Sequence, residues 1–533
     1  MKVRLYPCTE QRSTFAEETL TSIMERSNTG VCFSGGGTRA MSAAWGQLRG
    51  LHALGLLKHV RYISSVSGGS WASVPFTYFR QGPEDDQAFL GEVLAPEDIT
   101  MENLKALDEK TLGFCATQSF KGALFDFWKE DYPSDKLWSD TVGKIFLEPF
   151  GLFQQDDTGY FSYDQETVSK ILQRNPELAE SSFLTVREDR PYLIINSSLL
   201  GPSAMAPFDP EIVVGFQHTP LYSGTPASLS VAYQPIKGEA ESVMIGSGFV
   251  ESFALNSNAP TSLPVDDWAE TNVPESPFAL CDATGASSAA FAGFVDQHHL
   301  LGMFSSTTAL TPKAEYWPVS ESVEVSSREF SFGDGGVIEN YGLPALLQRK
   351  VTTAVVFINT ATPLGDSKDM STFEKGKEVD TYLPTLFGFQ VPSVGTYTSQ
   401  NQVFPKDEFE SVIRGLQEAK KGQKTVMTVT EHQVQDNGWW GIEGGWTVKV
   451  CWCYLDRVGE WEAQLNKEIS HDIAKGNHRF FSSGPFKNFP NYDTVDQNFL
   501  DLLELTPEQV SLLGHLCAWN ITSNEELFQA LLK

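Results

Sequence analysis

Two glycine-rich turns, each placed directly after a short apolar run, constrain the fold of this chain more than any other feature. The first run, Val31–Phe33, leads into Ser34-Gly35-Gly36-Gly37. Consecutive glycines lose much backbone entropy on folding, so a chain uses them where φ must be positive or where something approaches the backbone closely. Apolar residues then recur at helical spacing up to Gly55, which is a suitable helix stop: Met41, Ala44, Leu48 and Leu51. This order predicts a strand, a glycine loop and one helix with a buried stripe.

The second turn has the layout of a nucleophile elbow. Val60–Val66 contains good strand formers and runs directly into Ser67-Gly68-Gly69-Ser70, which an apolar, helix-like segment follows. A serine held between a strand and a helix presents its hydroxyl clear of the backbone, and only small neighbours fit around it. The usual pattern is G-x-S-x-G, and in this chain Ser65 takes the place of the first glycine. The context therefore predicts Ser67 as a nucleophile, in a motif that is weakened at Ser65.

Arg39 stands in the first turn of the first predicted helix, where the helix dipole disfavours a cation. The glycine loop before it directs backbone N–H groups past a helix start, and such an arrangement attracts anions. An arginine in this position indicates either an exposed side chain or a bidentate contact to a phosphate group. The residues taken alone favour the exposed side chain.

SGGGTRA (34–40) followed by SVSGGSW (65–71) resembles the catalytic domain of the cytosolic phospholipases A2 and, more distantly, the patatin-like lipid acyl hydrolases. Those enzymes carry a GGG-x-R loop, then a nucleophile elbow, and use a serine–aspartate dyad. The resemblance implies an aspartate followed by small residues far downstream, after a strand, and FSFGDGG supplies Asp334. Its Asp-Gly-Gly form is closer to the patatin-like enzymes, whereas Ser70-Trp71 is closer to the phospholipases. FQHTPLYSG (216–224) is a weaker match to a phospholipase segment between the dyad residues.

This resemblance implies a serine acyl hydrolase that cleaves fatty-acyl esters of phospholipids or lysophospholipids. Ser67 would attack the ester carbonyl, while Asp334 would accept its proton and later activate water. The amides of Gly36 and Gly37 would form the oxyanion hole, and Arg39 would hold the substrate phosphate. We expect no cofactor and no metal. The expected fold is α/β, with three α/β/α layers, a central mixed and largely parallel sheet, and an inserted cap or lid region.

Three other hypotheses compete with this one. The nine histidines leave room for a conventional Ser-His-Asp esterase. The serine at position 65 motivates a non-catalytic homologue that binds lipid or a protein partner. A nucleotide-binding loop is the weakest hypothesis, because GGGTR lacks the lysine and the Ser/Thr of a P-loop. His298-His299 is the one histidine pair, and neighbouring side chains rarely converge on a metal.

The chain has 533 residues and no internal repeat or long linker, so we expect residues 1–533 to form one large catalytic domain. Residues 80–190 are the candidate cap or lid, because aromatic residues are dense between Phe114 and Trp128, although a core role is favoured for them. Residues 457–533 are expected to be mostly helical, and 15–26 to form a lead-in helix. Two alternating runs, 424–434 and 447–455, flank a tryptophan-rich loop and predict a hairpin.

Net charge and cysteine content limit the classes of partner and the cellular compartment that we expect for this chain. The net charge of −29 disfavours nucleic acid and also electrostatic docking on anionic lipid surfaces. Transient peripheral contact with membranes would then depend on apolar insertion, a local basic patch or a partner. Seven cysteines are few and odd in number, and the N-terminus lacks a signal-like apolar core, so a cytoplasmic location is expected. Cys451 and Cys453 are expected as packed thiols on one face of a strand.

Overall fold

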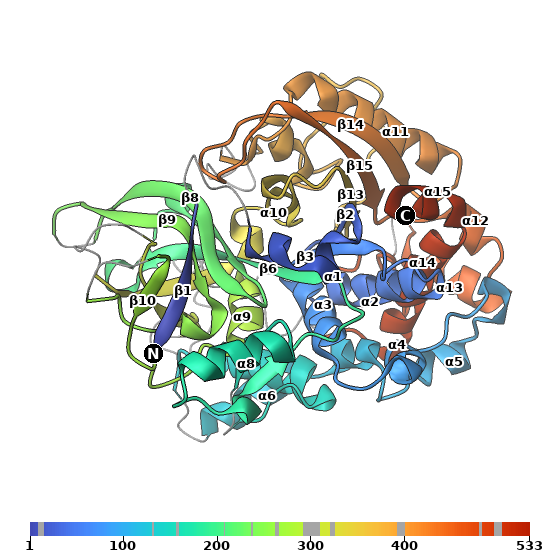
Figure 1. Ribbon diagram of the computed structural model, residues 1–533. Helices are drawn as coiled ribbons and strands as arrows, with labels where there is room; N and C mark the ends of the chain where they lie inside the picture. The colour runs from blue at the N-terminus through green and yellow to red at the C-terminus, as the bar shows by residue number, and fades with distance from the viewer. Residues whose placement is uncertain are drawn as a thin grey trace.

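A 13-stranded mixed sheet runs through the molecule (Figure 1). The computed structural model describes residues 1–8, 15–129, 133–155, 159–206, 208–235, 238–261, 266–290, 310–319, 326–391, 400–478, 482–494 and 504–533. At the centre of the sheet five strands pair in parallel: β6 (Tyr192–Pro202), β3 (Val60–Val66), β2 (Ser27–Phe33), β13 (Thr353–Ile358) and β15 (Trp446–Tyr454). Both predicted strands that precede the glycine-rich turns are therefore central in the sheet.

Antiparallel strands extend this centre on both sides, so the sheet is mixed as predicted, but its parallel part is narrower than predicted. One side continues from β6 through β7 (Val214–His218), β8 (Tyr222–Tyr233), β9 (Glu241–Glu251), β1 (Lys2–Pro7) and β10 (Trp268–Glu270). The other side ends with β14 (Met427–Val434), which forms the predicted hairpin with β15. Short connections between consecutive strands impose antiparallel pairing, because a parallel pair requires a long crossover.

Helices cover both faces of the central strands, which gives the expected α/β/α layers. In Figure 1, α2 (Gly37–Ala53), α3 (Gly68–Tyr78) and α9 (Leu280–Ser287) lie on one side of β3 and β6, and α10 (Leu343–Gln348) lies on the other. α11 (Phe409–Lys421) packs against β14. The two helices that follow the glycine-rich turns thus share one side of the sheet.

The helix α2 is buried almost all round, and not on the single stripe that its apolar spacing predicts. The reason is α14 (Pro507–Thr522), which packs along the side of α2 that the pattern leaves polar. Gly46 and Gly50 permit the close approach, since a Cβ at either position would overlap backbone oxygens of α14. Gly55 follows the helix with φ +62°, as expected for a helix stop.

The predicted lead-in helix over 15–26 is wrong. The chain begins with strand β1, continues through a 3-10 turn (Ala16–Thr19) and a short helix α1 (Thr21–Met24), and enters β2 at Ser27. Glu17 explains the break, because its fully buried carboxylate forms an ion pair with Arg349 at 2.6 Å between Oε1 and Nε. In an exposed amphipathic helix over 15–26, the Glu17 carboxylate would instead lie in water.

The remaining segments match several expectations. The last part of the described chain contains four helices, α12 (Gly459–Glu462), α13 (Lys467–Gly476), α14 and α15 (Glu525–Leu532). Phe120 and Phe127 are buried, in agreement with a core role for the aromatic region. Trp440 is buried as well, so the tryptophan-rich loop is a packed cluster. His298-His299 lies outside the described residues. None of the helices that the structure describes has the length and apolar character needed to cross a bilayer.

Candidate active site

Ser67 and Asp334 meet because two strands end head to head along one edge of β6. β3 pairs in parallel with residues 192–196 of β6. The strand β12 (Arg328–Asp334) pairs antiparallel with residues 197–202 of β6. β7 occupies the opposite edge, so β3 and β12 share one edge. The residue after β3 and the last residue of β12 therefore become neighbours, although 267 positions separate them.

The two side chains form a buried, hydrogen-bonded pair. Ser67 Oγ donates to Asp334 Oδ2 at 2.7 Å, and the amide of Gly336 donates to Oδ1 at 2.7 Å. Only 7% of Ser67 and 5% of Asp334 are exposed. Burial raises the pKa of Asp334 to about 7, although both hydrogen bonds act to lower it. A carboxyl group that titrates near neutral pH is suited to accept a proton and return it.

The backbone of Ser67 has the strained conformation of a nucleophile elbow, with φ 51° and ψ −122°. Ser287, at the end of α9, holds this conformation. The Ser67 amide donates to Ser287 Oγ at 3.0 Å and to Ser287 O at 3.1 Å. Ser287 Oγ in turn donates to Asn196 O on β6 at 2.7 Å. The sequence did not predict that Ser287 would bind the elbow.

Ser65, the residue that departs from the elbow motif, belongs to a buried hydroxyl network. Its Oγ accepts a hydrogen bond from Ser73 Oγ at 2.7 Å and lies 3.0 Å from Ser70 Oγ. Ser70 Oγ lies 3.0 Å from Ser287 Oγ, which connects the network to the support of the elbow. The serine that replaces the motif glycine therefore has hydrogen-bond partners for its hydroxyl group.

The glycine loop packs directly against the elbow. A Cβ at Gly68 would overlap Gly37 O, and a Cβ at Gly35 would approach the side chains of Asn340 and Ser67. Gly36 and Gly37 have φ values of +133° and +61°, which favour glycine. Within the described part of the chain, the amides of Gly36 and Gly37 donate no hydrogen bond. Two free N–H groups thus stand at the N-terminus of α2, next to the elbow.

Arg39 is buried, in contrast to the exposed side chain that the residues alone favoured. Nε donates to Asn359 O at 2.9 Å, and Nη1 donates to Tyr492 O at 2.6 Å and to Thr494 Oγ1 at 3.3 Å. Burial lowers the pKa of Arg39 to about 10. A Cβ at Gly36 would overlap Nη2, so this nitrogen faces the glycine loop. Nη2 has no acceptor among the residues that the structure describes.

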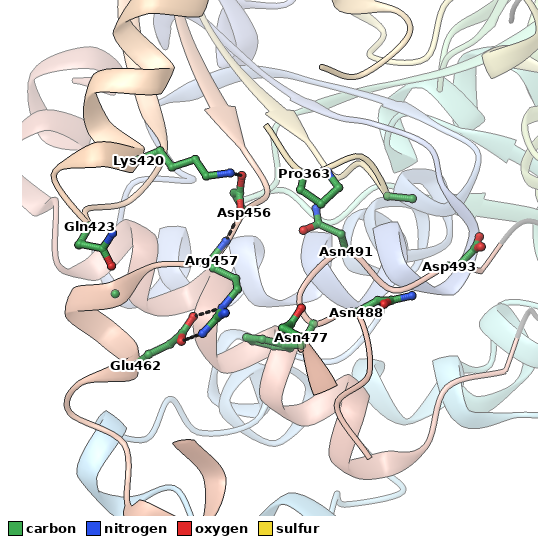
Figure 2. Close-up of a pocket in the computed structure, with 13 residues that line it drawn as sticks. Pro363, Lys420, Gln423, Asp456, Arg457, Glu462, Asn477, Asn488, Asn491 and Asp493 are labelled. Atoms are coloured by element: carbon green, nitrogen blue, oxygen red, sulfur yellow. Dashed lines mark hydrogen bonds and ion pairs between the residues drawn. The ribbon is translucent and has the colours of Figure 1, made fainter. Parts of the chain in front are cut away.

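Figure 2 shows a polar cavity of about 690 Å³ beside the segment that holds Arg39. Asn491 and Asp493 from this segment line the cavity, and neither Ser67 nor Asp334 does. Two ion pairs lie in its wall, Lys420–Asp456 and Arg457–Glu462. The cavity is therefore a neighbour of the Arg39 contacts and not the space in front of the dyad.

Histidine does not take part in the described dyad. His218 is fully buried, its ring nitrogens lie 3.0 Å from Ser197 Oγ and 3.3 Å from Ser223 Oγ, and burial lowers its pKa to about 3. Across the ranges that the structure describes, no histidine hydrogen-bonds to Ser67 or Asp334. The hydrogen-bond acceptor that the Ser67 hydroxyl has there is the carboxylate of Asp334.

Sequence comparison finds relatives over part of the chain. Cytosolic phospholipase A2 zeta from Mus musculus is 36% identical over 141 residues, a stretch that covers 26% of this chain and 15% of that protein. Its Homo sapiens counterpart is 63% identical over 41 residues, which cover 8% of this chain and 5% of that protein. Human cytosolic phospholipase A2 beta is 34% identical over 111 residues, or 20% of this chain and 13% of that protein. No family model matches the chain.

Among solved structures, human GIVD cytosolic phospholipase A2 matches with a TM-score of 0.46 and 12% identity, over 94% of this chain and 59% of that chain. Its complex with methyl gamma-linolenyl fluorophosphonate matches with a TM-score of 0.43 and 14% identity, over 96% of this chain and 59% of that chain. The α/β class therefore rests on the strands and helices described above. In sequence, this chain is similar to the cytosolic phospholipases A2, whose catalytic domain its motifs resemble.

Proposed function

We propose that this chain is a serine acyl hydrolase that cleaves fatty-acyl esters of phospholipids or lysophospholipids. The observation that carries the proposal is the 2.7 Å hydrogen bond from Ser67 Oγ, on a strained elbow, to the buried Asp334 carboxylate. Partial sequence similarity to cytosolic phospholipases A2 supports the substrate class. Ser67 Oγ attacks the ester carbonyl and Asp334 takes its proton. When the ester C–O bond breaks, Asp334 gives this proton to the departing alcohol oxygen, and it then activates the water that releases the acyl group from Ser67.

The free amides of Gly36 and Gly37 are the proposed oxyanion hole. They stand at the N-terminus of the 17-residue helix α2, whose dipole adds partial positive charge there. Loss of one oxyanion donor typically lowers the rate by about 10²–10³. Gly36 O accepts a hydrogen bond from Thr494 Oγ1 at 2.8 Å, which supports the orientation of the loop.

Arg39 is the proposed ligand for the substrate phosphate, through Nη2. Its other two nitrogens are held by acceptors of the chain, so Nη2 is the donor that remains available beside the loop. Arg39→Lys keeps the charge but loses the planar fork, and we expect it to reduce turnover of a phospholipid more than turnover of a neutral acyl ester. Equal losses on both substrates would make Arg39 a support for the glycine loop alone.

Residues 80–190 are the proposed cap over the acyl chain. Trp71, one helical turn after Ser67, stacks on Phe146 at 4.7 Å between ring centroids and contacts Phe120 and Trp138. Phe146, Phe120 and Trp138 come from the candidate cap region and are buried, so they pack the proposed cap onto the helix of the elbow.

Product analysis tests the proposal most directly. Wild type is incubated with a mixed panel of phospholipids, lysophospholipids and neutral esters, and released fatty acids are identified by mass spectrometry. Ser67→Ala and Asp334→Asn should each lower release by at least about 10³. A fluorophosphonate probe should label the wild type and fail to label Ser67→Ala. Labelling that persists in Ser67→Ala, or release that depends on a histidine and not on Asp334, would contradict the dyad.

A further inference from the structure

A groove of about 810 Å³ lies between β1, β10 and the helix α8 (Gln165–Arg174), and neither Ser67 nor Asp334 lines it. We propose that this groove binds an anionic amphiphile, meaning a carboxylate or phosphate group carried on one apolar chain. The proposal does not depend on the hydrolase activity, because it rests on other residues. In Figure 1, β1 and β10 lie beside the N-terminus at the left of the view, away from α2.

Three cations gather around one tryptophan in this groove. Lys2 and Arg4 alternate with buried Val3 and Leu5 along β1, so both point to the same face, and Arg4 is directly opposite Trp268 in the β1–β10 register. Lys2 Nζ lies 5.3 Å, Arg4 Cζ 5.9 Å and Arg174 Cζ 5.0 Å from the Trp268 ring centroid. The indole holds these cations close together despite their mutual repulsion.

Two of these cations are available to a ligand. The side chains of Lys2 and Arg4 make no hydrogen bond and no ion pair with any residue that the structure describes. Arg174, in contrast, is paired with the buried carboxylate of Glu251. The Arg4 guanidinium can donate two parallel hydrogen bonds, and the Lys2 ammonium adds a compact positive charge. Together they suit a carboxylate or a phosphate.

The acidic groups near the groove do not cancel this charge. Glu251 is occupied by Arg174 and by the Arg4 amide, which donates to Oε2 at 2.7 Å. Asp267 also lines the groove and Glu270 is opposite Lys2 in the strand register, and neither carboxylate forms an ion pair with Lys2 or Arg4. Such a concentration of cations stands out in a chain with a net charge of −29.

Part of the remaining wall is apolar, which favours a ligand with a hydrocarbon chain over a free inorganic ion. Phe15, Leu20 and Leu221 line this part together with Tyr6 and Pro7, and the polar Thr19, Thr167 and Gln173 line the groove as well. Its volume is within the roughly 300–1,000 Å³ typical of small-molecule sites. Each methylene group buried against this wall would tighten binding about fourfold.

The probe for a binding experiment is a dansyl-labelled fatty acid, used below its micelle concentration, with fluorescence as the readout. We expect saturable binding to the wild type and at least a tenfold weaker affinity for Lys2→Gln/Arg4→Gln. The matched control is Lys377→Gln/Lys421→Gln, which removes two exposed cations elsewhere and should bind as the wild type does. Ser67→Ala should also bind as the wild type does, so that failure of the hydrolase proposal remains distinguishable from failure of this one.

Competition distinguishes the sources of the anion. A lysophosphatidic acid and an unlabelled fatty acid of equal chain length should each displace the probe, with the tighter competitor identifying the preferred head. Displacement of equal strength by a neutral monoacylglycerol, or by inorganic phosphate at the same concentration, would overturn the proposal. So would unchanged affinity in Lys2→Gln/Arg4→Gln, whose folding is verified by circular dichroism and thermal unfolding.

Discussion

In the proposed mechanism, the carboxyl group of Asp334 determines the pH range in which Ser67 can act, because only the deprotonated form accepts a proton. With a pKa of about 7, this form becomes the major one only above neutral pH. We expect the rate of fluorophosphonate labelling to increase roughly tenfold per pH unit below 7 and to level off above it. Glu339, whose pKa burial raises to about 8, is the control. A profile that loses its pH dependence in Glu339→Gln would assign the titration to Glu339.

The same shift predicts a pH effect on stability. The pKa of Asp334 is raised from 3.8 to about 7 in the folded chain, so the folded state retains the proton more strongly than the unfolded state. The stabilisation is complete below pH 4 and is lost as pH rises through 7, a change of roughly 4 kcal/mol. The variant Asp334→Asn has no carboxyl group at this position and does not lose stability in this way. In urea titrations, its free energy of unfolding minus that of the wild type should therefore increase from pH 5 to pH 8. A constant difference would refute the shifted pKa.

Ser65 departs from the nucleophile-elbow motif, but its hydroxyl has buried hydrogen-bond partners in the structure. Restoring the motif with Ser65→Gly would leave Ser73 and Ser70 without their shared partner in a fully buried site. We therefore expect Ser65→Gly to lower the free energy of unfolding by about 1–3 kcal/mol and not to raise activity. Ser65→Ala, which removes only the hydroxyl, should reproduce most of that loss. A more active Ser65→Gly enzyme would show that the serine is a defect of the elbow.

At the scale of elements, sequence periodicity predicted the strand–turn–helix units around the two glycine-rich turns, since strand, loop and helix there are adjacent in the chain. The position of Asp334 after a strand was predicted by the resemblance to the phospholipases and not by periodicity. What it could not give was the shared edge of β6, because pairing between β3, β6 and β12 depends on contacts across more than a hundred residues. Ser287 was missed for the same reason: its partner at Ser67 is 220 positions away.

The packing of α14 against α2 fixes the position of the helix that begins at the glycine loop. Gly46→Ala would direct a Cβ into backbone atoms of Gly514, which cannot move without shifting α14. In an uncrowded helix this change would stabilise by about 1 kcal/mol. Here we expect a loss of about 1–3 kcal/mol in urea unfolding. Gly438→Ala is the control, since a Cβ there has no neighbour within 4 Å, and it should be near neutral.

On the scale of the whole molecule, the charge of the chain and its local cationic groove act over different distances. A net charge of −29 repels anionic surfaces over about a Debye length, roughly 10 Å at 0.1 M salt. The groove at Lys2 and Arg4 acts only on a ligand that has already entered it. A single anionic molecule can therefore bind the groove, even though an extended anionic membrane is repelled by the rest of the surface.

This difference predicts how the chain chooses between membranes. In vesicle sedimentation at low salt, we expect a larger bound fraction with zwitterionic phosphatidylcholine vesicles than with vesicles containing phosphatidylserine. At 0.5 M salt the two fractions should converge, because screening removes the repulsion and leaves apolar contacts unchanged. The double variant Lys2→Gln/Arg4→Gln should show the same preference for phosphatidylcholine vesicles, because the groove is too small to determine the long-range electrostatic field of the molecule. Stronger binding to phosphatidylserine vesicles at low salt, lost in that double variant, would instead make the groove a membrane-docking patch.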